Sequence, residues 1–242
     1  TCSDELFELV RIGADARRVS IVPCGVDLRR FRPDGPALAR SAGSARHRIV
    51  VVSRLVQRKG IGNAISALAG IPDAELLVAG GPPAARLDRD PDVRRFRQHA
   101  EAEGVADRVR FLGGLQPDAV AALLRSADVV ACVPWYEPFG MVALETMACG
   151  VPVVATAVGG LVDTVVDGVT GLHVPPRRPA EMARAIGHLL RRPDLRAAMG
   201  AAGAERARQR YGWSSVAAET LAAYSRAAGA SASDTPATEV RR

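Results

Sequence analysis

Short apolar runs alternate with helix-like segments along most of this sequence. The runs are rich in β-branched residues and nearly continuous, and they comprise Arg48–Ser53, Glu75–Ala79, Val109–Leu112, Asp128–Val133, Pro152–Ala155 and Gly171–Val174. Segments with helical spacing of their apolar residues lie between and after them, at Ile61–Ala69, Pro91–Glu103, Ala119–Arg125, Met141–Cys149, Ala180–Leu190, Leu195–Arg210 and Ser214–Ala227. This alternation is typical of strands buried on both faces of a parallel sheet. The sequence therefore predicts an α/β fold, a Rossmann-like doubly wound parallel sheet with C-terminal helices.

The two ends of the chain depart from this alternation. The first 45 residues contain the end of a helix at Asp4–Ile12, a lone strand at Val19–Val22 and a Pro/Gly/Ala/Ser-rich linker at Arg32–Ala45. A single strand needs a partner, so we interpret this part as the end of a truncated N-terminal domain.

The resulting domain division places the truncated end and linker at 1–45 and the Rossmann-like domain with its C-terminal helices at 46–228. Residues 229–242 are rich in Ala, Ser, Thr and Pro. That composition predicts a disordered tail.

Composition excludes several functional classes. No apolar run approaches the roughly 20 residues that span a bilayer, and no secretory leader is evident. The net charge of +6 comes from arginines spread along the chain rather than from basic clusters with aromatics, which argues against nucleic-acid binding. The charge remains compatible with anionic small ligands or an anionic membrane surface. The four cysteines lack CxxC spacing, which points to a reducing, cytoplasmic compartment and to no metal site.

The first predicted strand runs into a loop that carries two cations. Ser53 and Arg54 follow the strand, and Lys59, the single lysine among 31 arginines, precedes Gly60. Ligands of open α/β sheets bind beyond the carboxyl ends of the strands, and Arg and Lys there suit phosphate oxygens. The alternative is that Arg54 and Lys59 are solvated loop cations.

The fourth strand leads into the segment from Glu137 to Glu145. Pro138 and Gly140 predict a sharp turn into a helix N-terminus, where free amides and the helix dipole favour an anionic diphosphate. Two carboxylates on either side of such a turn can accept hydrogen bonds from sugar hydroxyls. Glu145 lies among apolar neighbours, so a buried carboxylate with a partner is favoured over a surface glutamate.

These segments together resemble the group 1, or family 4, glycosyltransferases of the GT-B fold. The resemblance covers the chain from Thr1 to about Tyr224. It rests on five stretches that occur in the family's order and spacing, namely Ile21–Pro33, Ser53–Gly60, Ala79–Pro82, Glu137–Glu145 and Met147–Leu172. It implies the C-terminal, donor-binding domain of a two-domain enzyme and a fragment that lacks the N-terminal domain with its acceptor pocket. The missing domain, a nucleotide-sugar and an acceptor (a small molecule, glycan or lipid) are then the implied partners.

The resemblance also implies residue roles. Arg54, Lys59 and Glu137 are the expected catalytic residues. The expected donor-binding residues are Ser53, Arg54, Lys59, Gly81, Glu137, Phe139, Gly140, Met141, Val142 and Glu145. Arg54 and Lys59 would hold the diphosphate, Glu137 the sugar hydroxyls and Glu145 the ribose.

The implied reaction is transfer of a hexosyl or N-acetylhexosaminyl group from a nucleotide-diphosphate sugar with retention at the anomeric carbon. It needs no essential metal or cofactor, and Gly80-Gly81-Pro82 slightly favours a UDP-sugar. Two alternatives remain open, a nucleotide-sugar-binding module without transfer activity and another GT-B-fold enzyme such as an epimerase. The expected location is the cytoplasm, with peripheral contact at the inner membrane face as an option.

Overall fold

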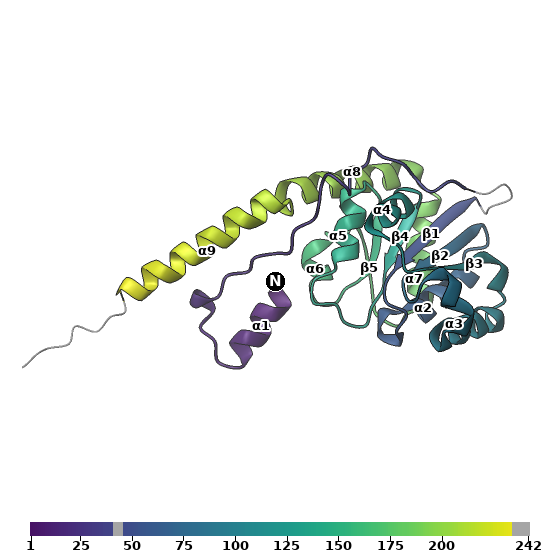
Figure 1. The fold of residues 1–242 in the computed structure, drawn as a ribbon, viewed down its shortest axis with the longest axis horizontal. Helices are drawn as coiled ribbons and strands as arrows, with labels where there is room; N and C mark the ends of the chain where they lie inside the picture. Colours follow the sequence, from purple (N-terminus) through teal and green to yellow (C-terminus); the bar gives the residue numbers. More distant parts are fainter. Residues whose placement is uncertain (41–45, 234–242) are drawn as a thin grey trace, which may run out of the picture.

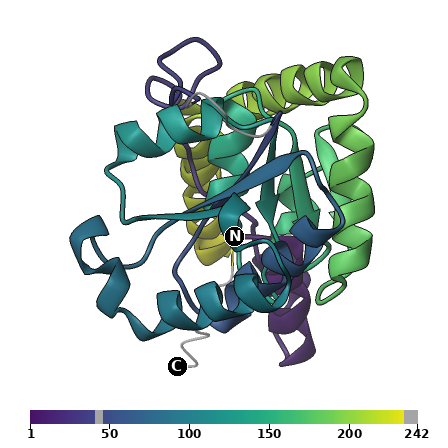
Figure 2. The same ribbon diagram turned by 90° about the vertical axis from the view of Figure 1, so that its right-hand side faces the viewer.

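The body of the protein is a six-stranded sheet with helices on both faces (Figures 1 and 2). The computed structural model describes residues 1–40 and 46–233. All paired strands run parallel, in the order β3-β2-β1-β4-β5-β6. The strands are β1 (His47–Val52), β2 (Ala74–Ala79), β3 (Val109–Gly113), β4 (Val129–Cys132), β5 (Val153–Thr156) and β6 (Gly171–Val174). The predicted doubly wound parallel sheet is confirmed, and each of the six strands predicted for it overlaps an observed one.

Nine α-helices lie within the described residues: α1 (Ser3–Arg11), α2 (Ile61–Ala69), α3 (Pro91–Ala102), α4 (Pro117–Arg125), α5 (Met141–Ala148), α6 (Leu161–Thr164), α7 (Pro179–Leu190), α8 (Pro193–Arg210) and α9 (Trp213–Ser233). Short 3₁₀ segments are η1 (Ala16–Arg18), η2 (Gln57–Lys59), η3 (Ala84–Arg89) and η4 (Ala106–Arg108). Four helices begin with proline. Proline suits that position because its fixed φ is helical and its missing N–H would have had no helical acceptor.

Alternate residues of the strands build two separate cores. In β1, Ile49 and Val51 pack into the core beneath α2, α3 and α7, whereas Val50 packs into the core beneath α4 and α5. Because successive side chains of a strand point to opposite faces, a strand buried on both sides must be apolar throughout. This is why the apolar runs of the sequence are continuous rather than alternating.

The N-terminal segment packs along the body instead of forming a domain. Val26 makes an isolated parallel bridge with Gly212, and the Leu38 amide donates to the Ala122 carbonyl at 2.9 Å. Part of the predicted linker is thus attached to α4, while its residues 41–45 lie outside the described residues. Figure 1 shows α1 and α9 extending from the sheet on the side opposite β3. Among the described residues, no helix is both long and apolar enough to cross a membrane.

One prediction at the N-terminal end is wrong. Val19–Val22 forms no strand, because a β-branched run becomes a strand only where a neighbour pairs with it, and none of the described residues does so. Residues 229–233 of the predicted tail continue α9, and the disorder of the tail stays a prediction. The rest of the predicted tail, 234–242, lies outside the described residues.

Candidate active site

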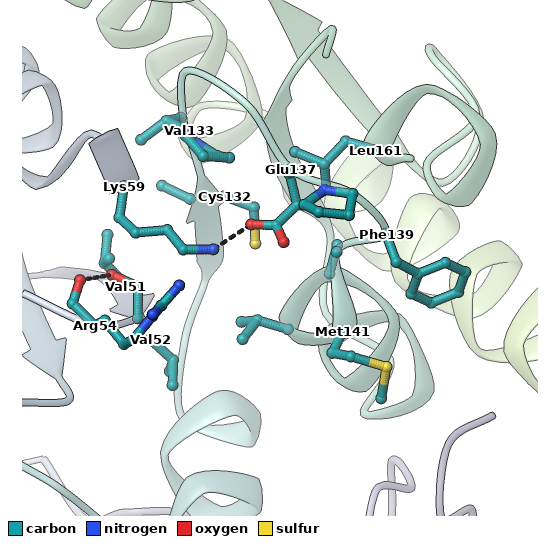
Figure 3. Close-up of a pocket in the computed structure, with 17 residues that line it drawn as sticks. Val51, Val52, Arg54, Lys59, Cys132, Val133, Glu137, Phe139, Met141 and Leu161 are labelled. Carbon is teal, nitrogen blue, oxygen red and sulfur yellow. Dashed lines mark hydrogen bonds and ion pairs between the residues drawn. The ribbon is translucent and has the colours of Figure 1, made fainter. Parts of the chain in front are cut away.

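A cavity of about 320 Å³ opens at the carboxyl ends of β1 and β4 (Figure 3). These neighbouring strands lie where the chain order of the sheet reverses, and ligands of doubly wound sheets bind in the crevice at that point. Eight of the ten predicted donor residues line it, namely Ser53, Arg54, Lys59, Glu137, Phe139, Gly140, Met141 and Val142. The structure thus brings together residues that are up to 89 positions apart in sequence (53 to 142).

Lys59 and Glu137 form an ion pair across this cavity (Figure 3). Their side chains are 16% and 19% exposed, so water screens the pair less than it would a surface pair. Arg54 is exposed and lies beside Lys59 at the same end of β1. Two cations and one carboxylate therefore face the same space, and the carboxylate neutralises one of the cations.

A close backbone contact fixes the position of Lys59. Gly60 follows Lys59 in a left-handed conformation (φ 75°), and a Cβ placed there would lie 1.9 Å from the carbonyl oxygen of Val133. Only glycine allows the η2 segment to pack against the end of β4 in this way. The Trp135 amide also donates to the Arg58 carbonyl at 2.8 Å. The loop after β1 is therefore attached directly to the loop after β4.

A second glycine contact fixes the backbone of Glu137. The Gly160 amide donates to the Glu137 carbonyl at 2.9 Å, and a Cβ on Gly159 would lie 2.2 Å from that oxygen. A Cβ on Gly160 would lie 2.4 Å from the carbonyl oxygen of Pro138. The sequence indicated a small-residue turn at this position, but it gave no sign that the turn packs against the segment that carries the carboxylate.

The N-terminus of α5 forms another wall of the cavity. Gly140 stands at its N-cap with φ 96°, and no side chain caps the helix. The first amides of a helix lack carbonyl acceptors within the helix, so they can donate to an anion. Phe139 is 7% exposed, and its ring makes an edge-on contact with Tyr211 at 6.1 Å between centroids. Its contribution to the cavity is therefore mainly backbone.

Two predicted donor residues do not line the cavity. Gly81 follows β2, where a Cβ would lie 2.5 Å from the Leu55 side chain. Glu145 lies one turn further along α5, is half-buried, and makes no side-chain hydrogen bond with any described residue. Burial raises the pKa of Glu145 to about 7, and the Arg30 guanidinium opposes that shift. The sequence predicted a partner for this carboxylate, and in the structure that partner is the nearby charge of Arg30 rather than a hydrogen-bond donor.

Cys132 is a lining residue that the sequence indicated only as a small core side chain. Its place at the end of β4 could have identified it, because ligand-facing residues follow strand ends. Burial raises the pKa of its thiol to about 12, and Glu137 adds to the shift. The thiol is therefore protonated at neutral pH and contributes packing rather than a nucleophile. Within the described residues, no group of three or more His, Cys, Asp or Glu could hold a metal ion.

Comparison with solved structures agrees with this fold. Sucrose-phosphate synthase from Thermosynechococcus elongatus superposes with a TM-score of 0.79 at 32% identity, covering 95% of this chain and 58% of that protein. The Anabaena protein HepE, in complex with UDP-glucose, gives a TM-score of 0.78 at 25% identity, with 94% and 62% covered. Both share the GT-B type of fold.

Sequence comparison gives the family. The D-inositol 3-phosphate glycosyltransferase of Mycobacteroides abscessus is 40% identical over 228 residues, which are 93% of this chain and 50% of that enzyme. The chain thus spans about half the length of this relative. The family model for glycosyl transferases group 1 matches residues 41–206. The chain belongs to the group 1 glycosyltransferases, and its domain is of the C-terminal GT-B type.

Proposed function

We propose that this chain supplies the donor site of a retaining glycosyltransferase that uses a nucleotide-diphosphate sugar, with a UDP-sugar favoured. The observation that carries the proposal is the cavity at the β1/β4 switch point, where Arg54 and Lys59 face Glu137 and the uncapped N-terminus of α5. HepE was solved with UDP-glucose, and it shares this fold. The acceptor site would lie in sequence beyond this chain, since the relative is about twice as long.

Arg54, Lys59 and the α5 amides would hold the diphosphate. In the transfer step the bond between the anomeric carbon and the diphosphate oxygen breaks, and negative charge grows on the departing nucleoside diphosphate. Cations and helix amides fixed before the reaction stabilise that charge without reorganising. The backbone contacts of Gly60 and Gly159 supply that fixed geometry. No metal is needed in this scheme.

The Lys59–Glu137 ion pair implies a rearrangement on donor binding. In the structure each group satisfies the other. A diphosphate would take Lys59 as its partner and free Glu137 to accept hydrogen bonds from the hydroxyls of the transferred sugar. Glu145, one turn away on α5, would accept hydrogen bonds from the ribose hydroxyls.

Calorimetric titration of UDP and UDP-glucose into Glu137→Gln tests these roles. Because the substitution releases Lys59 from its ion pair, UDP should bind as tightly as to the unchanged chain or up to about tenfold tighter. UDP-glucose should bind at least about tenfold more weakly. The variant loses a hydrogen bond to a charged group, and such a bond contributes roughly 1.4 kcal/mol or more. Equal losses for both ligands would refute the division of roles.

Lys59→Ala is the second arm of the same titration. Loss of the cation should weaken both UDP and UDP-glucose, because both carry the diphosphate. GDP and ADP, titrated in parallel, identify the nucleotide. If no nucleoside diphosphate binds the unchanged chain, or if Lys59→Ala leaves binding unaltered, the donor site is not in this cavity.

A further inference from the structure

A second cavity of about 270 Å³ lies on the other side of the loops that carry Lys59 and Glu137. Its lining comes from η2, α2, α3 and the loop after β4, and it consists of Gln57, Gly60, Gly62, Asn63, Ser66, Arg95, Phe96, His99 and Trp135. Gln57 and Gly60 flank Lys59 in sequence, and Trp135 is two residues before Glu137. The donor cavity and this second cavity therefore share the two loops as a wall.

Two neutral amide side chains stand within the otherwise largely apolar lining surface of the second cavity. The Gln57 and Asn63 side chains each offer an amide N–H₂ and a carbonyl oxygen, so each can donate and accept hydrogen bonds. A hydroxyl group has the same double character, because it donates once and accepts through its lone pairs. The lining therefore matches a ligand that carries several hydroxyls.

Ser66, His99 and Glu103 form a hydrogen-bond network beside this cavity. The Ser66 hydroxyl donates to Glu103 Oε1 at 2.5 Å, and its oxygen lies 2.8 Å from His99 Nε2. Since the serine proton goes to the carboxylate, His99 Nε2 carries a hydrogen and donates to Ser66. The histidine thus cannot take the serine proton, and the network fixes the polar wall rather than activating a nucleophile.

The Trp135 side chain forms part of the shared wall and is held in place there. The Arg177 guanidinium stacks on its ring at 4.0 Å from the centroid. Arg177 has φ 58° and is the one non-glycine residue with positive φ among those described, a conformation that costs energy and persists where the surroundings enforce it. The enclosed indole Nε1–H has no hydrogen-bond partner in the described structure.

The same contacts argue against two other ligand classes. A planar nucleobase needs a free aromatic face, but Arg177 covers Trp135, and Phe96 is 4% exposed and stacked on Phe111. For an anion, the lining offers the single cation Arg95, whose side chain is 54% exposed and pairs with Asp92 at 2.9 Å. The Glu103 carboxylate beside the cavity would also repel an anion.

We propose that this second cavity binds one uncharged pyranose ring, either as a free sugar or as a unit of a glycan. Its volume is near the lower end of the roughly 300–1,000 Å³ that small-molecule sites occupy, which suits a ligand of about one sugar ring. Because the cavity shares its wall with Lys59 and Glu137, an occupied cavity holds the two loops of the donor site in place. The proposal does not rest on the donor function proposed above.

The indole N–H signals of the ¹⁵N-labelled chain provide the test. The sequence has two tryptophans, Trp135 and Trp213, and Trp135→Phe assigns their signals. Methyl α-glucopyranoside, methyl α-mannopyranoside and methyl β-N-acetylglucosaminide are titrated to 50 mM. At least one should move the Trp135 signal along a saturable curve and leave that of Trp213, which lies on α9, unchanged. A linear trisaccharide of the same sugar that binds more tightly identifies a glycan, and equal binding identifies a free sugar.

Variants locate the binding site. Asn63→Leu should weaken the glycoside at least tenfold, and Gln57→Ala, on the exposed 3₁₀ turn, repeats the test should the first variant fold poorly. Asp88→Ala, which breaks an exposed ion pair and lines neither cavity, should keep the affinity within twofold. The proposal is overturned if no glycoside gives a saturable shift, or if uridine or inorganic phosphate gives the same shift. Loss of binding in Glu137→Gln with retention in Asn63→Leu also overturns it, since the sugar would then occupy the donor cavity.

Discussion

At the scale of single residues, the half-buried carboxyl of Glu145 makes stability depend on pH. Burial raises its folded-state pKa to about 7, whereas in an unfolded chain the carboxyl has its ordinary pKa of about 4.5. The folded state therefore binds more protons than the unfolded state between these values. Because of this difference, the free energy of unfolding falls as pH rises from about 4.5 to 7, and the penalty is complete above that range.

Glu145→Gln should remove this penalty. Each pKa unit corresponds to about 1.4 kcal/mol, and partial exposure of the group reduces the effect, so the variant should be about 1–3 kcal/mol more stable at pH 8. At pH 5 the two proteins should differ little, because the carboxyl is largely protonated when folded. Urea unfolding at both pH values measures this. An equal gain at pH 5 and pH 8 would mean that the charge is not the cause.

The same carboxyl gives a prediction for ligand binding. The ionised group accepts hydrogen bonds from ribose hydroxyls better than the neutral acid does, so uridine should bind more tightly at pH 8 than at pH 6. Uridine is the appropriate probe because it lacks a phosphate that titrates in this range. In Glu145→Gln the pH dependence should disappear, and its persistence would assign it to another group.

Residue types and strand ends were enough to predict which side chains meet at the donor cavity. Ser53, Arg54 and Lys59 follow one strand and Glu137 follows another, and the parallel sheet brings them to the same edge. What could not be predicted is which groups pair in the structure. The Lys59–Glu137 contact depends on how two loops approach, and that approach is set by backbone contacts of Gly60 and Gly159 that leave no periodic signal in the sequence.

At the scale of secondary-structure elements, β1 and β2 are joined by a buried ion pair. Arg48 Nε donates to Glu75 Oε1 at 2.7 Å, and the two side chains are 1% and 7% exposed. Arg48 also donates to the Leu38 carbonyl at 3.1 Å, which attaches the N-terminal segment to the sheet. Neither polar residue interrupts the strand pattern of the sequence, because each stands near the start of its strand.

Glu75→Leu should be among the most destabilising single changes. It leaves a buried guanidinium without its carboxylate, a loss of about 3–5 kcal/mol. The double variant Arg48→Met/Glu75→Leu should recover most of that loss. Asp88→Ala, which breaks the exposed Arg97–Asp88 pair, is the control and should cost less than about 1 kcal/mol. Chemical denaturation of the four proteins measures these differences, and a double variant as unstable as Glu75→Leu would contradict the account.

Elements with a periodic pattern of apolar residues were predicted well. Elements that depend on local contacts were predicted poorly. The six strands and the longer helices follow from continuous apolar runs and from proline at helix starts. The four-residue α6 was interpreted as a turn, because one helical turn has no periodicity to detect. The strand predicted at Val19–Val22 is not observed, because none of the described residues pairs with it.

At the scale of the whole molecule, the N-terminal helix makes fewer buried contacts than the strands of the sheet. Helix α1 contains no buried residue, and its Ser3 backbone amide and hydroxyl donate to Asp163 at 2.6 and 2.7 Å. Exposed apolar side chains on α1 include Phe7 and Leu9, at 64% and 41% exposure. A region with few buried contacts opens at much lower free energy than the strands of the core.

Amide hydrogen exchange should therefore proceed in two stages. The amides of α1 should exchange fast, while those of β1 and β2 should exchange only on global unfolding. Asp163→Ala removes the carboxylate that accepts the hydrogen bonds of Ser3, so it should accelerate exchange in α1 without altering that in the sheet. Mass spectrometry of peptic fragments measures both. Equal protection of α1 and β1 would show that the N-terminal helix is part of the core.

The glycine contacts beneath the donor cavity also limit how such a site can diversify. A side chain at Gly60 would separate the loop after β1 from the end of β4, and one at Gly159 would separate the turn after β5 from the Glu137 segment. Mutational libraries aimed at a new donor would accordingly lose most members that vary these glycines. The productive positions are side chains projecting from an unchanged backbone, such as Met141 and Val142. An enzyme engineer can treat the two loops as one rigid part and alter only the surface that it presents.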